Sequence, residues 1–215
     1  MLIEKIENPD IWQYVKELEK EMDLPENFTW GLYKSANDWL FIISLHAFLE
    51  SMVTKVLEIQ YDEATFKTIY KLPLNGRTSK LGLIADSHNL PKTYIKFATQ
   101  LSDLRNKCAH DITFFNFSLK EHLDNNPKEL SIFVNNMELS IKDGIMAPDG
   151  NTYSQKNFIK NFPNEAILLG IIVWLGTLRL IISQEDLLKK NKEQDEKRIR
   201  LINELFQENF GFFNR

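Results

Sequence analysis

Apolar residues that recur every three or four positions constrain this chain more than any other feature of its sequence. The longest such run extends from Ser35, a residue type favoured at helix N-termini, to about Gln60. Only 8 glycines and 7 prolines occur among the 215 residues, so few positions interrupt helices. The sequence therefore predicts a mainly α-helical protein with one buried core.

The same spacing, together with residues that begin or end helices, predicts six further helices. They are expected at Pro9 to Met22, Asp62 to Tyr70, Thr78 to Asn89, Pro91 to Ala109, Asn164 to Ser183 and Gln184 to Phe206. The segment Asp23 to Lys34 contains a proline and a glycine and is expected to be a connection.

The stretch from Ile112 to Phe162 has a different character. Leu130 to Val134 and Met137 to Ile141 partly alternate between apolar and polar residues, as strands do. Asp143-Gly144 and Asp149-Gly150 are turn dipeptides. We expect an irregular insertion with room for a small β-hairpin.

The length fits a single domain with four parts. These are an N-terminal helix and connection (1–34), a core that carries the candidate site (35–111), the insertion (112–162) and the C-terminal helices (163–215). Fifteen phenylalanines and four tryptophans exceed the needs of one core and indicate a further buried surface, such as an oligomer interface.

Charge and cysteine content exclude several classes. The formal net charge is −4, so any contact with nucleic acid must be local rather than spread over the surface. Cys108 is the only cysteine, which excludes a disulfide within the chain and a multi-cysteine zinc site. A single thiol suits a reducing cytoplasm, and Met1 to Asp10 lacks the apolar stretch of a signal peptide. The chain is therefore expected in the cytoplasm.

One segment resembles a membrane span in composition. Ala166 to Ile182 is apolar over 17 residues except for Arg179 near its end. A transmembrane helix needs about 20 apolar residues, so the sequence favours a helix buried inside the protein, with no membrane contact.

The run Leu104 to Asp111 reads L-R-N-K-C-A-H-D and contains the strongest candidate site. Arg105 and His110 are five positions apart, about 140° around an ideal helix, so in mid-helix they diverge. At a fraying C-terminal turn they could face one cleft, particularly if a second subunit supplies the opposite wall.

Such residues can cleave RNA without a metal. Histidine transfers protons near neutral pH, and arginine holds a phosphate in a fork of donors. The 2′-hydroxyl would attack the neighbouring phosphate, with His110 handling a proton and Arg105 stabilising the charge on the phosphorane. Asn106 adds donors and an acceptor.

A structural role accounts for the same residues. His110 is favoured at a helix C-terminus by the helix dipole. Arg105 would then form an ion pair with Asp103, Glu50 or Asp111.

The string Arg105-Asn106-Lys107-Cys108-Ala109-His110 resembles the R-x4-6-H signature of the HEPN superfamily. Ser44 to Glu50 resembles the early HEPN helix that carries an acidic residue. Leu74 to Leu90 resembles the mannitol operon repressor branch, which has a similar F-S-x-K-I-x-L-A run. The similarity covers roughly Trp39 to Phe117, and this chain has cysteine where that branch usually carries phenylalanine in the motif.

This resemblance implies an up-and-down helical bundle that forms a homodimer with the active site at its interface. It implies that Arg105 and His110 are catalytic, with Asn106 supporting them and Glu50 as an acidic partner that orients Arg105. Asp103 is a further supporting candidate beside Arg105. It also implies metal-independent RNA cleavage without a cofactor, in a toxin–antitoxin or phage-defence setting with an antitoxin or regulatory protein as partner. Some HEPN proteins lack the activity and act as transcriptional regulators or adaptors, which is the alternative function.

Lysines and an arginine near the motif are candidates for a basic rim that guides an RNA strand. They are Lys107, Lys80 and Arg77, with Lys92 and Lys96 beside them, although an ordinary solvated face explains them equally well.

His46 and Glu50 share one helix face at a spacing that a metal site or a proton relay could use. No third ligand is evident in the sequence, so a satisfied, partly buried pair is the expected role and no metal is expected.

Overall fold

The computed structural model describes residues 9–21, 24–34, 37–110, 116–138 and 140–210, with 9–12 and 202–210 described through their backbone alone. Helices dominate these ranges, and one two-stranded hairpin accompanies them, which confirms the mainly α class with a small hairpin. The elements are α1 (Pro9–Glu21), α2 (Phe28–Lys34), α3 (Asp38–Gln60), α4 (Glu63–Ile69), α5 (Lys80–His88), α6 (Lys92–His110), α7 (Leu119–Asn125), α8 (Pro127–Asn136), β1 (Ile145–Met146), β2 (Thr152–Tyr153), α9 (Gln155–Asn161) and α10 (Pro163–Phe210).

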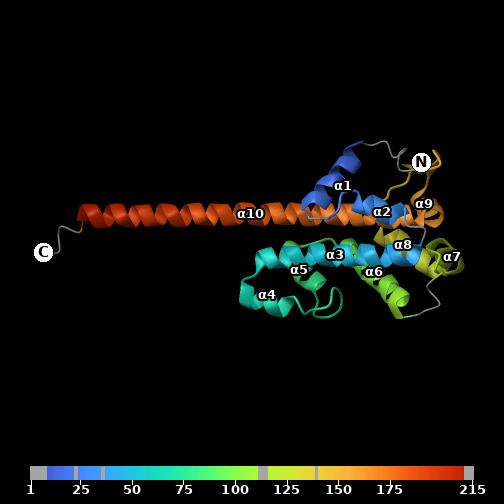
Figure 1. Cartoon of the computed structure of the whole chain (residues 1–215), viewed down its shortest axis with the longest axis horizontal. Coiled ribbons are helices and arrows are strands. Elements are labelled where there is room, and N and C mark those ends of the chain that lie inside the picture. Colours follow the sequence, from blue (N-terminus) through green and yellow to red (C-terminus); the bar gives the residue numbers. More distant parts are fainter. Residues whose placement is uncertain (1–8, 22–23, 35–36, 111–115, 139, 211–215) are drawn as a thin grey trace.

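Helix α3 lies at the centre, between α10 and α6 (Figure 1). It is buried on several sides, and it contributes ten of the buried side chains. Asn164 of α10 donates to Asp38 at the start of α3, and Gln60 at the end of α3 donates to Glu185 of α10, so these two helices run parallel. Trp39 of α3 donates to the carbonyl of Cys108 near the end of α6, so α3 and α6 run antiparallel.

Two glycines of α10 allow close approach by other helices. A Cβ at Gly170 would overlap the ring of Phe97 in α6, and one at Gly176 would overlap the hydroxyl of Tyr14 in α1. A side chain there would require the Phe97 ring or the Tyr14 hydroxyl to move, so glycine at both positions matches this close packing. The indole of Trp174 adds a hydrogen bond of 2.9 Å to the carbonyl of Tyr94.

The prediction of a bare connection from Asp23 to Lys34 is wrong, because α2 lies within it. The carboxylate of the buried Glu19, in α1, accepts hydrogen bonds from the backbone N–H groups of Asn27 at 3.0 Å and Thr29 at 2.7 Å. Phe28 packs edge-on against Phe48 with ring centroids 5.9 Å apart. This short helix is therefore stabilised by a cap and a packing partner from elsewhere in the chain.

The start of the central helix also differs from the prediction. Asn37, not Ser35, is the N-cap of α3, and its side-chain oxygen accepts from the N–H groups of Trp39 at 2.8 Å and Leu40 at 3.4 Å. Ser35 itself lies outside the described residues.

The expectation of an irregular insertion at 112–162 is wrong in part, because most of its described residues form α7, α8 and α9. Leu130 to Val134 lies in α8, where Pro127 occupies the first turn and Leu130 and Phe133 are buried on one face. The hairpin lies instead around Asp149-Gly150, where Gly150 has φ 83°.

The two helices expected after Asn164 are one continuous helix of 48 residues. No glycine or proline follows Gly176 before Phe210, so the charged half simply extends the apolar half. Figure 1 shows the C-terminal half of α10 projecting well beyond the rest of the protein.

Helices α3 and α10 are long and apolar enough to cross a membrane by length and composition. Within their most apolar windows, 56% and 50% of the residues are buried inside the protein. In α10, Ile171, Trp174 and Leu178 are buried, whereas Leu180 is 67% exposed. The segment is thus covered on one side rather than all round.

Candidate functional site

Helix α6 carries the candidate motif and is held by its apolar face. Phe97, Leu101, Leu104 and Cys108 recur at helical spacing and are all buried. The helix remains regular through His110, where the described segment ends. The expected fraying turn does not occur before His110, and Asp111 lies outside the described residues.

Arg105 lies at the edge of the buried face and is partly exposed. Its Nη1 donates to Oδ1 of Asn106 at 3.0 Å. Among the described residues it forms no ion pair with a carboxylate, so neither Asp103 nor Glu50 neutralises it directly. The guanidinium thus keeps donors for another acceptor, and Asn106 orients it as a neighbour on the same helix.

His46 of α3 forms the buried part of this region. Its Nε2 lies 3.1 Å from Oγ of Ser102, whose hydroxyl donates to the carbonyl of Ala98 at 3.0 Å. Because that hydroxyl proton is already used, Nε2 of His46 is the donor to Oγ of Ser102. Burial lowers the pKa of His46, the negative charge of Glu50 raises it, and the charge of Arg105 lowers it further, with a net decrease.

Glu50 was expected to orient Arg105, but its ion pair in the structure is with Lys80 of α5, at 3.1 Å. The Lys80 side chain is only 6% exposed, and its ammonium lies 5.5 Å from the centre of the Tyr70 ring. Lys80 therefore lies away from the solvent rim where the sequence placed it. Glu50 and Arg105 both act on the charge state of His46, so they remain electrostatic neighbours.

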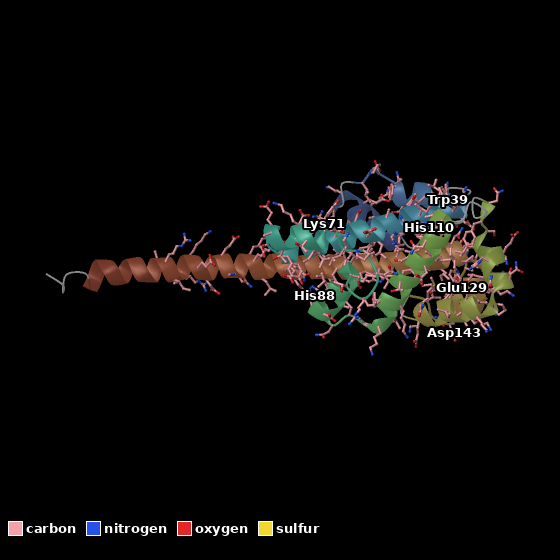
Figure 2. All side chains as sticks on the ribbon, turned by 90° about the horizontal axis from the view of Figure 1, so that it is seen from below. Trp39, Lys71, His88, His110, Glu129 and Asp143 are labelled. Carbon is pink, nitrogen blue, oxygen red and sulfur yellow. The ribbon has the colours of Figure 1, made fainter. Side chains whose placement is uncertain are left out.

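His110 is exposed at the end of α6 (Figure 2). The indole of Trp39 donates to the carbonyl of Cys108 at 2.6 Å, which fixes this end of the helix against the start of α3. Because α6 is regular here, His110 and Arg105 point about 140° apart. A single chain therefore does not bring the two side chains to one phosphate.

The face of α6 that carries His110 also carries Lys107 and Asp103, which are both exposed. These three positions, spaced by four and three residues, form one stripe along the helix. Arg77 is exposed in the segment between α4 and α5. The structure thus groups Asp103 and Lys107 with His110, and places Arg105, Glu50 and Lys80 on another side of α6.

Lys107 has partners that the sequence did not suggest. Its Nζ lies 3.0 Å and 3.1 Å from the two carboxylate oxygens of Glu129 in α8, and Nε2 of His122 in α7 lies 2.7 Å from one of them. Burial raises the pKa of Glu129, but the hydrogen bonds and charges of Lys107 and His122 outweigh burial and lower it overall. Glu129 is therefore ionised near neutral pH and binds both neighbours.

Gln100 and Asn136 were also absent from the sequence-based candidates. Both are 8% exposed, and Asn136 donates to the side-chain oxygen of Gln100 at 2.8 Å. The only sequence signal for them would have been the helical period of Leu130 and Phe133, which pairs α8 with α6.

The described residues contain no group of three or more histidine, cysteine or acidic side chains arranged to hold a metal ion. Burial, and then the negative charge of Asp38, raises the pKa of Cys108 to about 11, so this thiol stays protonated near neutral pH.

No protein-family model, curated protein or solved structure matches this chain.

Proposed function

We propose that this protein is a metal-independent endoribonuclease of HEPN type that serves as a toxin or phage-defence effector. The observation that carries the proposal is the availability of the two motif side chains. Arg105 has no carboxylate partner among the described residues, and His110 is exposed at the end of the same helix. Both side chains are therefore available to a phosphate.

The chemistry follows from these two groups. The 2′-oxygen of a ribose forms a bond to the adjacent phosphorus, and the bond from phosphorus to the 5′-oxygen of the next nucleotide breaks. The 2′-hydroxyl loses its proton and the 5′-oxygen gains one; His110 carries one of these protons and water exchanges the other, while Arg105 stabilises the added negative charge on the phosphorane. The products are a 2′,3′-cyclic phosphate and a 5′-hydroxyl end.

The geometry of α6 adds a requirement for a second copy. Since Arg105 and His110 diverge by about 140° along a regular helix, one chain presents only one of them to a given phosphate. In the proposed homodimer, Arg105 of one protomer and His110 of the other face the same scissile phosphate across a two-fold axis.

The test uses purified protein, single-stranded RNA and a chelator in a gel assay. The wild-type protein is expected to cleave, and Arg105→Ala and His110→Ala each to lose at least about a hundredfold in rate. Lys142→Ala, an exposed lysine outside the site, is the matched control. Equal cleavage by wild type and His110→Ala, or none by either, would remove the catalytic claim.

Mixing the two inactive variants tests the composite site. If each site takes Arg105 and His110 from different protomers, a mixed dimer regains one intact site, so the mixture should recover about a quarter of the wild-type rate. If both residues come from one protomer, the mixture stays inactive.

A second function is favoured by that same divergence. A HEPN-type regulator or adaptor needs no common cleft for the two side chains, and an antitoxin or regulatory protein would be its partner. Such a protein keeps its function when His110 is replaced, and a pull-down with both versions should then recover the same partner.

A further inference from the structure

A groove of about 1160 Å³ lies between α6 and α8, beside the candidate motif but on the other side of α6 from Arg105. The two helices run antiparallel here, because Lys107 pairs with Glu129 at one end and Gln100 pairs with Asn136 towards the other. Seven residues separate Gln100 from Lys107, so these levels are about 10 Å apart along the helix.

One end of the groove holds a polar group without a partner. Gln100 lines the groove and is 8% exposed, and its Nε2 has no hydrogen-bond partner among the described residues. Its Oε1 is already used by Asn136. A buried amide that donates to nothing is costly. Because Nε2 is shielded from solvent, the Gln100 side chain must turn towards the groove to meet an acceptor atom of a ligand.

The other end is electropositive. Asn126, the N-cap residue of α8, makes no side-chain hydrogen bond to the first turn, and its Nδ2 donates to the carbonyl of His122 at 2.7 Å. The uncapped N-terminus of α8, Lys107 and Lys128 all line this end. Pro127 has no N–H, and the N–H of Leu130 bonds to the carbonyl of Asn126. The N–H groups of Lys128 and Glu129, the helix dipole and the ammonium of Lys128 therefore form the site for an anion, while Lys107 is shared with Glu129.

Acidic groups also line the groove and limit this field. Glu129 is bound by Lys107, which offsets its charge, and Nε2 of His122 lies 2.7 Å from one of its oxygens. Asp103 is exposed at an intermediate level. Lys96 lies nearer the start of α6 and has the opposite charge to Asp103. Like Lys128, it has no ion pair among the described residues.

We propose that this groove binds a nucleoside monophosphate group, either a free nucleotide or the 5′-phosphorylated end of an RNA strand. The phosphate lies at the N-terminus of α8 with Lys128 and Lys107, and the base lies towards Gln100, whose amide donates to an acceptor on the base edge. Ile95 and Ile132 supply apolar surface for the base and ribose, and Ile132 is 52% exposed.

His110 lies one turn beyond Lys107 on the same stripe of α6. A strand anchored by its terminal phosphate would therefore begin near His110. Binding itself uses none of the proposed catalytic residues, so the groove can hold a nucleotide even if the protein cleaves no RNA.

The experiment is calorimetric titration of the full chain with AMP, adenosine, inorganic phosphate and a short oligoribonucleotide with either a 5′-phosphate or a 5′-hydroxyl. Lys128→Glu is expected to weaken AMP binding at least about tenfold, because it reverses a charge beside the phosphate. Gln100→Leu is expected to weaken AMP binding severalfold. Lys156→Glu, an exposed lysine of α9, is the matched control and should bind as wild type does.

Saturable binding of AMP that both groove variants weaken, with adenosine and phosphate each weaker than AMP, supports the proposal. Preference for the 5′-phosphorylated oligonucleotide over AMP supports the RNA end as the source of the ligand, and the reverse preference supports a free nucleotide. If neither AMP nor the 5′-phosphorylated oligonucleotide binds, or if Lys128→Glu leaves binding unchanged, the proposal is overturned. Because Lys128 is exposed, that variant remains informative even if Gln100→Leu fails to fold, and cleavage assays with His110→Ala test the proposed function separately.

Discussion

The two sides of α6 differ in how completely the protein covers them. The side towards α3 holds buried apolar residues and the pair of His46 and Ser102, whose polar atoms bond each other. The side towards α8 borders an open groove and contains an amide nitrogen, of Gln100, without a described partner. One side is therefore organised as a core and the other as a surface that a ligand can complete.

This difference changes the meaning of the motif. Arg105 lies beside the covered side, within electrostatic range of His46, whereas His110 lies on the open side with Lys107. A spacing of five residues on a regular helix separates a structural environment from a binding environment. Stability should respond strongly to changes on the first side and weakly to changes on the second.

The largest difference is expected from truncating side chains on the two sides. Leu101→Ala removes a buried side chain that is 1% exposed and should lower the free energy of unfolding by about 2–5 kcal/mol. Thr99→Ala, on the groove side, should change it by less than about 1 kcal/mol. Urea denaturation followed by circular dichroism measures both, and similar losses would show that the groove side is also a packed core.

The ion pair between Glu50 and Lys80, on the covered side, should contribute less to the free energy of unfolding than Leu101 does. Glu50→Ala leaves the ammonium of Lys80 buried without its carboxylate, which should cost about 2 kcal/mol, since Glu50 itself is partly exposed. The double variant Glu50→Ala with Lys80→Met removes both charges and should recover part of the loss. An equally unstable double variant would mean that packing by these side chains, and not charge, is responsible.

The pH dependence of the free energy of unfolding should also come from the covered side. The folded state lowers the pKa of His46 below its ordinary value of 6.5, so the unfolded chain binds the proton more readily. The contribution of His46 is complete above the ordinary pKa and is lost as the pH falls through the lower folded pKa, with a slope of at most about 1.4 kcal/mol per pH unit. Unfolding of the wild type and His46→Asn between pH 7.5 and pH 5 should show a shallower slope in the variant; parallel slopes would contradict the assignment.

The smallest effect is expected at His110. This side chain is exposed and makes no hydrogen bond with the described residues, so His110→Ala should change the free energy of unfolding by less than about 0.5 kcal/mol. A larger loss measured in the same urea experiment would indicate a structural role at the helix end, and would weaken the proposal that this histidine is kept for chemistry.

Helical period was enough to predict most helices, because their apolar residues repeat on one face, as in α3 and α6. It missed α2, since the cap of that helix comes from Glu19, eight and ten residues before the N–H groups that it binds. It missed the role of α8 because a short helix with few buried residues resembles an alternating strand. In both cases the deciding contacts join distant parts of the chain.

The candidate site was predictable only in part for the same reason. The motif string identified α6, but the partners of its residues depend on tertiary packing. Lys80 has the composition of a surface lysine, yet it is buried against Tyr70 and Glu50. Glu129 and His122 lie on separate helices within the segment that the sequence suggested to be irregular, so no local spacing could connect them with Lys107.

Helix α10 implies a gradient of protection along one uninterrupted element. Its first half is fixed by buried residues such as Trp174, whereas Leu187 and Leu188 in the second half are 60% and 62% exposed. Beyond Glu185, helical hydrogen bonds have almost no tertiary support, and isolated helices of modest length are marginal in water. Backbone amides should therefore exchange with deuterium slowly before about Ile182 and progressively faster towards Leu201, although both belong to the same helix.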